Sequence, residues 1–454
     1  MPATYSALLA EQNLTTENLL LISAERILRG FMDILFENAK VITMDEAAPY
    51  LENAYVAVKG GKIVYIGEAA PQEQAKRRID ARGKLLMPGL INGHTHVPMT
   101  LFRGLSDDCE LDVWLREHIW PAEDKLTSES VRAGTELSIA EMLASGTTSF
   151  SDSYFFVEDI AEVVQTSGIK ANLSRSIIGN GEDFENMPSV SEMRELFSRF
   201  HMAEGGRIRV DASIHAEYTT ETKCRMKVAE FAKENNLILQ IHTSESKSEH
   251  ENCITRYRKT PTELFLSEGL FDGVRPLLAH CCYITEHDMD IIKAHGGSVA
   301  SCVISNLKLA SGIPDLPLML ENGVNVSLGT DSVASNNNTD MFEEIKLVAT
   351  LYKGISLNPT AMDALTALCL ATVNGARAQG RDDCGILKEG YDADIIMLDF
   401  DRPHLVPCHN AISNTVYSAH GSDVVLTMVR GEILYENGEF KTIDIERAKR
   451  GVMA

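Results

Sequence analysis

The middle of the chain alternates apolar, strand-like segments with amphipathic, helix-like segments, and this alternation constrains the fold most. The eight strand-like segments occupy residues 89–96, 147–153, 170–177, 207–215, 237–243, 276–280, 298–302 and 324–331. Eight strand–helix units over residues 89–378 match the size of a (β/α)8 barrel. We therefore predict an α/β protein with a TIM-type barrel over this range. A doubly wound sheet is less favoured, because no glycine-rich phosphate-binding turn follows the first strand.

The two ends of the chain contain short β-rich runs instead. Residues 32–88 include a hairpin signal at Gly60-Gly61, and residues 379–454 include runs such as DADIIMLDF. We predict a small β-sandwich built from both ends, with a C-terminal tail. Residues 1–31 are predicted to be an N-terminal extension of one or two short helices. Whether it is peripheral, with Met32 as a second start, or docked on the fold stays open.

Composition excludes several classes of protein. The formal charge of −23 argues against nucleic acid as a partner, because phosphate binding needs basic patches. No uncharged apolar run is long enough for a membrane span. The nine cysteines are odd in number and form no C-x-x-C pair, so they predict neither a disulfide framework nor a thiolate zinc site. A reducing cytoplasm is the simplest compartment.

Polar residues end five of the eight predicted strands. They are His94 and His96, His215, His242, His280 and Asp331. The carboxyl ends of barrel strands form the active-site face, so these side chains are expected at one mouth. A buried core histidine explains one such position but not the whole set.

The His94-x-His96 pair indicates a metal site. Residues i and i+2 of a strand point to the same face, so both imidazoles can bind one ion. His242 and Asp331 supply a third and a fourth ligand. Three nitrogens and one carboxylate oxygen suit Zn²⁺, with Fe²⁺ and Mn²⁺ as alternatives.

Glu245 follows His242 by three residues and is expected just past the strand end, beside the ion. A carboxylate there can carry protons between water and substrate. The alternative role is a cap or first-turn acid at the start of the next helix.

These residues resemble the amidohydrolase superfamily, and within it the chlorohydrolase and aminohydrolase branch. The most similar group is the 5-methylthioadenosine/S-adenosylhomocysteine deaminases. The resemblance covers about residues 32–440 and rests on PGLINGHTHVPMTLFRGLSDD, LDVWLREHIWPAED, SIHAEYTT, IHTSES, LLAHC, SNLKLASG and SLGTDSVASNNN.

The resemblance implies a role for each matching position. His94, His96, His242 and Asp331 match the metal ligands. Asp331 also matches the base that takes a proton from water. His280 matches the residue that orients the attacking water, and Glu245 matches the proton shuttle. Glu123 matches the carboxylate that binds both ribose hydroxyls. Trp114 matches an aromatic wall for the purine or thioether. His215 and Arg175 match substrate-binding positions. Helix packing for Trp114, a surface acid for Glu123 and a structural ion pair for Arg175 are the alternatives.

The implied activity is metal-dependent hydrolytic deamination of adenosine-type nucleosides, namely 5-methylthioadenosine, S-adenosylhomocysteine, adenosine or 5-deoxyadenosine. The products are the inosine form and ammonia, and the partner is a small nucleoside. Another aminohydrolase or chlorohydrolase of the branch, with a guanine-type or triazine substrate, is the first alternative, and a non-catalytic scaffold is the second. Homo-oligomers are expected by analogy.

The chain departs from the branch in two places. Ser301 stands where the branch usually has histidine before the Ser305-Asn306 pair. Tyr283 holds the position after LLAHC where an aromatic residue or histidine often appears in the branch. Both are expected at the pocket mouth, where they bear on substrate choice. In related barrels with two metal ions, a carboxylated lysine on strand four bridges them. Segment 207–215 has no lysine, which favours a single ion.

Overall fold

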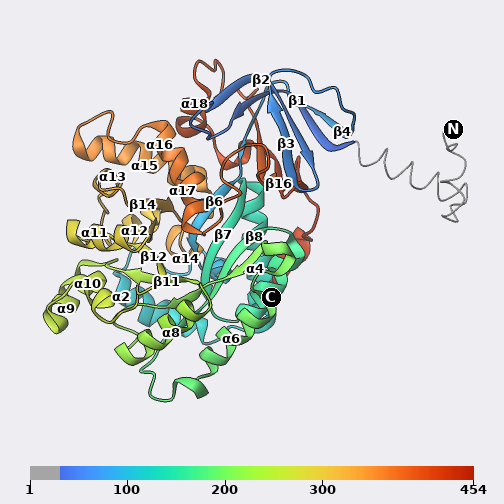
Figure 1. The fold of residues 1–454 in the computed structure, drawn as a ribbon. Helices are drawn as coiled ribbons and strands as arrows, with labels where there is room; N and C mark the ends of the chain where they lie inside the picture. Colours follow the sequence, from blue (N-terminus) through green and yellow to red (C-terminus); the bar gives the residue numbers. More distant parts are fainter. Residues whose placement is uncertain (1–30, 454) are drawn as a thin grey trace, which may run out of the picture.

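The computed structural model describes residues 31–453, so nearly all of the predicted N-terminal extension lies outside the described residues. The barrel strands are β6 (Leu90–Thr95), β7 (Thr147–Tyr154), β8 (Lys170–Ile177), β9 (Ile208–Val210), β10 (Ala212–Ile214), β11 (Ile238–Thr243), β12 (Arg275–His280), β13 (Ser298–Ser301) and β14 (Asn325–Leu328). They pair in parallel in chain order. A parallel bridge between Thr95 and Asp331 joins the first strand to the last. The predicted barrel is confirmed (Figure 1).

The predicted strand 207–215 consists of β9 and β10, separated by Asp211. Ile208 pairs with Ala171 and Ser213 with Ser176, so the register against β8 does not change across the break. The two pieces therefore act as one strand of the barrel.

Helices surround these strands. The longer ones are α4 (Ser128–Ala144), α5 (Val157–Ser167), α6 (Pro188–Phe200), α8 (Thr222–Glu234), α9 (Lys247–Tyr257), α10 (Pro261–Ser267), α11 (Glu286–Ala294), α15 (Met341–Ser356) and α16 (Ala364–Leu370). Shorter ones are η1 (Val97–Phe102), α2 (Leu111–Val113), η2 (Trp114–Ile119), α3 (Trp120–Glu123), η3 (Phe184–Asn186), α7 (Ala203–Gly206), α12 (Val303–Lys308), α13 (Leu316–Glu321), α14 (Val333–Asn336) and α17 (Val373–Ala378). None of the helices in the described part is long and apolar enough to cross a bilayer.

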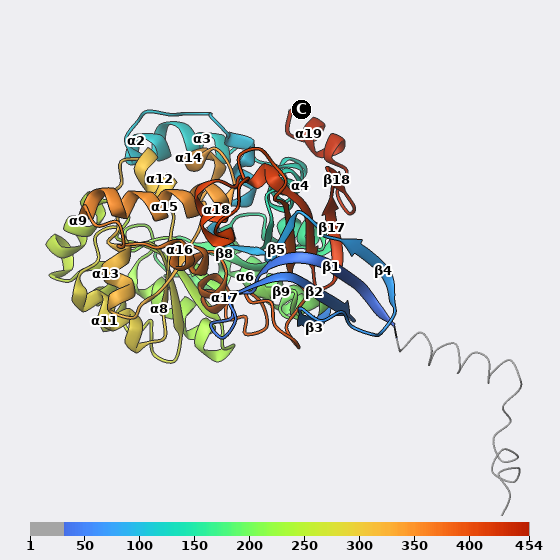
Figure 2. The same cartoon turned by 90° about the horizontal axis from the view of Figure 1, so that it is seen from above.

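Both chain ends build one mixed sheet beside the barrel (Figure 2). Its strands are β1 (Met32–Ile42), β2 (Tyr50–Lys59), β3 (Lys62–Gly67), β4 (Ala75–Asp80), β5 (Lys84–Pro88), β15 (Ile395–Asp399), β16 (Val424–Val429), β17 (Glu432–Glu436) and β18 (Glu439–Phe440). Strand β15 runs antiparallel to β5 and so joins the two ends. Gly60 and Gly61 turn β2 into β3 with φ of +57° and +80°, the left-handed backbone that this hairpin turn requires.

The C-terminal part also contributes helices. They are α18 (Ala411–Tyr417), η4 (Gly421–Asp423) and α19 (Ile445–Met453). Helix α19, in the predicted tail, packs against α4 of the barrel. An ion pair between Arg447 and Glu136 links the same two helices.

A buried ion pair joins the terminal sheet to the barrel. Lys170 begins β8 and is 1% exposed. Its Nζ lies 2.7 Å from Oδ2 of Asp392 and also contacts Asp394, both just before β15. Charges held this far from water require such partners, because an unpaired buried charge is strongly unfavourable.

We expect Lys170→Met to lower the free energy of unfolding by about 3–5 kcal/mol, because it leaves two buried carboxylates without this cation. Lys76→Met is the matched control. Lys76 pairs with Asp33 at 2.7 Å, but its side chain is 53% exposed. Its loss should cost less than about 1 kcal/mol. Denaturant unfolding of both variants measures the difference, and equal losses would contradict a structural role for the buried pair.

Candidate active site

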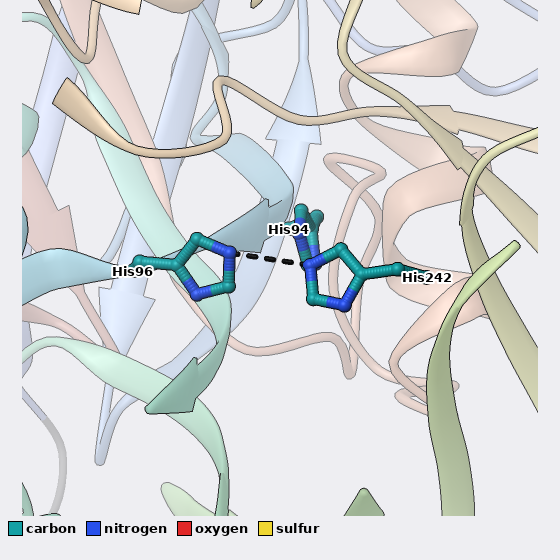
Figure 3. A group of neighbouring side chains, drawn as sticks. All are labelled: His94, His96 and His242. Carbon is teal, nitrogen blue, oxygen red and sulfur yellow. Dashed lines mark hydrogen bonds between the residues drawn. The ribbon is translucent and has the colours of Figure 1, made fainter. Parts of the chain in front are cut away.

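The predicted metal ligands converge at the carboxyl ends of the barrel strands. His94 lies within β6 and His96 just beyond it, while His242 lies near the end of β11 (Figure 3). The Nε2 atoms of His96 and His242 are 3.3 Å apart. Oδ1 of Asp331, which follows β14, lies 3.3 Å from Nε2 of His96 and 3.7 Å from Nε2 of His94. The structure thus brings together all four side chains.

Backbone carbonyls orient two of these rings. Nδ1 of His96 lies 2.6 Å from the carbonyl oxygen of Ser153, and Nδ1 of His242 lies 2.9 Å from that of His215. A carbonyl oxygen only accepts, so both Nδ1 atoms carry the proton and donate it. In the neutral rings the Nε2 lone pairs then face one another, which is favourable only with a cation between them.

The third imidazole supports the same conclusion. Nε2 of His94 is buried and has no hydrogen-bond partner among the described residues. Burial lowers the pKa of His94 and of His242, which favours the neutral, ligating form of each ring. Burial also opposes protonation of His96, but the hydrogen bond and charge of Asp331 raise its pKa to about 9. A positive charge is therefore favoured at this point, and three nitrogens with one carboxylate oxygen fit a divalent ion.

Two hydroxyl groups hold the aspartate. Oδ2 of Asp331 accepts hydrogen bonds from Ser305 at 2.6 Å and from Ser335 at 2.9 Å. This leaves Oδ1 directed at His94 and His96. The backbone of Asp331 has φ of +59°, a conformation that few residues other than glycine adopt and that often marks functional sites.

His280, at the end of β12, completes the cluster. Its Nδ1 lies 2.9 Å from Oδ1 of Asn306, and its Nε2 lies 3.9 Å from Oε2 of Glu245. Sequence reasoning quoted the Ser305-Asn306 pair only as part of a motif and assigned it no role. The structure places the pair on α12, where it holds Asp331 and His280. The SNLKLASG run was a usable signal for this pair, and the SLGTDSVASNNN run, which contains Ser335, was one for the second hydroxyl.

Glu245 lies in the cavity beside the cluster. Ser311 donates a hydrogen bond to its Oε1 at 3.1 Å. Burial raises the pKa of Glu245, so its carboxyl group keeps a proton to higher pH than an exposed glutamate does. The residue that caps α9 is Ser246, whose hydroxyl accepts from the backbone N–H of Glu249. Glu245 is therefore not the helix cap.

The cavity next to the cluster has a mixed lining of aromatic and acidic side chains. Trp114, Glu123 and His215, three of the predicted substrate-binding residues, all line it. The hydroxyl of Tyr154 donates a hydrogen bond to Oε1 of Glu123 at 2.7 Å. Burial raises the pKa of Glu123. Tyr154 and Trp120 also line the cavity. Neither was predicted to bind substrate, although Trp120 lies in the quoted LDVWLREHIWPAED run and Tyr154 directly follows the predicted strand 147–153.

Trp114 and His215 are each fixed by a hydrogen bond. Trp114 is 5% exposed, and its Nε1 donates to the carbonyl oxygen of Ser106 at 3.1 Å. Nδ1 of His215 lies 3.0 Å from the hydroxyl oxygen of Thr219. Both rings are thus held in place by short-range contacts at the cavity wall.

Arg175 is not among the side chains that line this cavity. Its guanidinium pairs with Glu192 and lies 4.9 Å from the ring centre of Phe155, a residue of the lining. A substrate contact by Arg175 stays a prediction.

The two departures from the branch lie in different places. Ser301, expected at the mouth, ends β13 fully buried and is not part of the lining. Its hydroxyl has no hydrogen-bond partner among the described residues. Tyr283 lines an outer hollow that adjoins the cavity and shares Leu111, Trp120 and Leu309 with it.

Comparison with known proteins agrees with this architecture. A model of the amidohydrolase family matches residues 85–434. A 5-methylthioadenosine/S-adenosylhomocysteine deaminase of Thermoanaerobacter pseudethanolicus is 41% identical over 422 residues, which cover 93% of this chain and 98% of the relative. A 5'-deoxyadenosine deaminase of Methanosarcina mazei is 43% identical over 415 residues, covering 91% of this chain and 95% of the relative.

Solved structures give the same result. An adenosine deaminase from Xanthomonas campestris with bound zinc superposes with a TM-score of 0.87 at 32% identity, covering 93% of this chain and 97% of that chain. A triazine hydrolase from Arthrobacter aurescens reaches 0.86 at 24% identity, which shows a shared fold. The metal-ligand cluster, the barrel and these matches lead to one conclusion: the chain belongs to the amidohydrolase family.

Proposed function

We propose that the protein is a hydrolytic deaminase of adenosine-type nucleosides, which it converts to the inosine form and ammonia. The observation that carries this proposal is the position of Glu123 in the same cavity as the histidine–aspartate cluster. A cluster alone suits many hydrolyses, whereas a fixed carboxylate is an acceptor for the two hydroxyls of a ribose. The names of the relatives support the same substrate class.

The ion that we propose is a single Zn²⁺ held by His94, His96, His242 and Asp331. Histidine nitrogens and carboxylate oxygens are ligands that Zn²⁺ binds in proteins, and a structural relative carries zinc. No lysine is present in segment 207–215 to bridge a second ion. When bound, a divalent ion lowers the pKa of water from 15.7 to about 7, which supplies a nucleophile at neutral pH.

The residues of the chain move the protons. Asp331 accepts a proton from the attacking water, which His280 orients by a hydrogen bond. The carboxyl group of Glu245 protonates N1 of the purine as oxygen adds to C6. The C6–N bond then breaks as the proton held by Asp331 passes to the leaving amine, which departs as ammonia. The C6 hydroxyl gives its proton to the carboxylate of Glu245, which forms the C6 carbonyl of the inosine product and restores the Glu245 carboxyl group. The raised pKa of Glu245 suits a group that must donate a proton near neutral pH.

The remaining cavity residues bind the substrate. Glu123, held by Tyr154, accepts hydrogen bonds from the 2′- and 3′-hydroxyls of the ribose. Trp114 forms an aromatic wall, and His215 contacts the purine from the end of β10. Arg175 is proposed to contact substrate only if it leaves Glu192. A guanine-type or triazine substrate has no ribose hydroxyls for Glu123 to bind. This disfavours the alternative of another aminohydrolase or chlorohydrolase of the branch.

A non-catalytic scaffold is disfavoured by the intact ligand cluster. A cytoplasmic location and a homo-oligomeric state stay predictions.

The metal proposal predicts about one divalent ion per chain in the purified protein, with zinc the main element. His94→Ala or His242→Ala should lower this content to near zero, because each removes one of four ligands. His287→Ala is the control, since that side chain is 67% exposed and outside the cluster. Elemental analysis by mass spectrometry measures all four proteins. A wild-type protein without metal would instead favour the scaffold.

A nucleoside panel with ammonia detection tests the activity. We expect deamination of adenosine, 5-methylthioadenosine or S-adenosylhomocysteine but not of guanine or chlorinated triazines. Glu245→Gln should lower kcat by about 10²–10⁴-fold and keep the metal, because the amide cannot donate a carboxyl proton. Activity on free bases or triazines alone would refute the nucleoside assignment.

The role of Glu123 predicts a separate signature. Glu123→Gln should raise KM for the ribonucleoside by roughly tenfold, about the value of one charged hydrogen bond, while the metal content stays unchanged. For the 2′,3′-dideoxynucleoside the same substitution should change KM little, since no hydroxyls are present. An equal increase in KM for both substrates would show that Glu123 does not bind the sugar.

A further inference from the structure

We propose that Glu249 is a positioning residue that holds the turn after β11 and thereby places the carboxyl group of Glu245 for proton transfer. The inference rests on the role proposed above for Glu245. Glu249 lies in the first turn of α9, outside the group of residues to which sequence or comparison assigns a role.

The side chain of Glu249 binds two consecutive backbone groups. Its Oε1 accepts a hydrogen bond from the N–H of Ser244 at 3.0 Å, and its Oε2 accepts from the N–H of Glu245 at 2.7 Å. An acid at this position of a helix ordinarily bonds to the N–H of the capping residue, here Ser246. Glu249 instead reaches beyond the cap to the two residues that connect strand to helix.

The turn that it holds is strained. Ser244 has φ of +49°, a left-handed conformation that side chains other than glycine rarely adopt. Such a conformation persists only when surrounding contacts fix it. The carboxylate bridge of Glu249 is such a contact, together with the hydrogen bond from the N–H of Tyr283 to the carbonyl oxygen of Ser244.

This turn determines where Glu245 points. The bond from Glu249 fixes the backbone N–H of Glu245, and its carboxyl group then meets Ser311 and lies 3.9 Å from His280. Without the bridge, Ser244 could return to an ordinary conformation, which would rotate Glu245 away from the cavity.

The position of Glu249 is electrostatically unfavourable, which argues against a merely stabilising role. Glu249 is 8% exposed, and the two neighbouring charges that act on its carboxyl group, Glu245 and Glu217, are both acids. Burial and the neighbouring Glu245 raise its pKa to about 8. A neutral apolar side chain would pack here at lower cost, but it could not accept the two N–H groups.

The kinetic experiment compares variants on 5-methylthioadenosine. Glu249→Ala should lower kcat by about 10²-fold, with KM changed less than about threefold and full metal content, because small misplacements of a catalytic group have effects of this size. Glu249→Gln keeps one acceptor and should recover part of the rate. Glu251→Ala is the matched control, since Glu251 lies on α9 and its side chain is 64% exposed. It should behave as wild type.

A double-variant cycle separates positioning from general damage. In a Glu245→Gln background, Glu249→Ala should change the residual rate less than threefold, because the carboxyl group that Glu249 positions is no longer present. A full 10²-fold loss in that background, or an unchanged kcat in Glu249→Ala alone, would overturn the inference.

A crystal structure of Glu249→Ala provides a readout that does not depend on the substrate. We expect Ser244 to leave the left-handed region and the hydrogen bond between Ser311 and Glu245 to be lost. If Glu245 keeps its position, the inference is wrong whatever the activity. If the wild type deaminates no nucleoside, the proposed function fails, and this structure still decides the role of Glu249.

Discussion

The closure of the barrel and the assembly of the site depend on the same contact. The N–H of Asp331 donates to the carbonyl oxygen of His94 at 3.0 Å, and Thr95 and Asp331 form the parallel bridge between the first and last strands. These bonds place the carboxylate of Asp331 against His94 and His96. Because strands far apart in sequence must meet before the ligands do, a cluster of this kind forms only in the closed fold.

Orientation within the cluster comes from neutral hydrogen-bond partners. Carbonyl oxygens fix the tautomers of His96 and His242, and two serine hydroxyls fix one oxygen of Asp331. Such partners set the direction of these three ligands without adding charge, so the net charge at the centre is left to the ion. This explains how four side chains from three separate strands reach a common point.

The barrel and its ligands could be predicted from sequence because both follow simple periodicities. Eight apolar segments predicted the barrel strands, and the histidines and the aspartate of the site occurred at the ends of five of them. The supporting residues followed no period. Ser335 and Glu249 act from helices that follow strands, and Tyr154 acts from the end of β7. Sequence spacing does not reveal which side chains these three residues contact. Ser301 was likewise expected at the pocket mouth because it ends a strand, but its side chain is fully buried and does not line the cavity.

Buried acids that accept hydrogen bonds from backbone N–H groups recur around this site. Asp152 accepts from the N–H of Val97 at 2.8 Å after β6, and Glu249 holds the turn after β11. Glu344 accepts from the side chain of Asn336 at 2.9 Å and from the N–H of Ile304 at the start of α12.

Burial raises the pKa of both Glu249 and Glu344 to about 8, far above the value in an unfolded chain. An acid with a raised folded pKa contributes less stability as the pH rises from its unfolded pKa through about 8. At neutral pH the burial of these two carboxyl groups therefore lowers the free energy of unfolding. In return, each carboxyl group fixes backbone N–H groups that a hydrophobic residue would leave unpaired, and the strand ends that carry the chemistry become rigid.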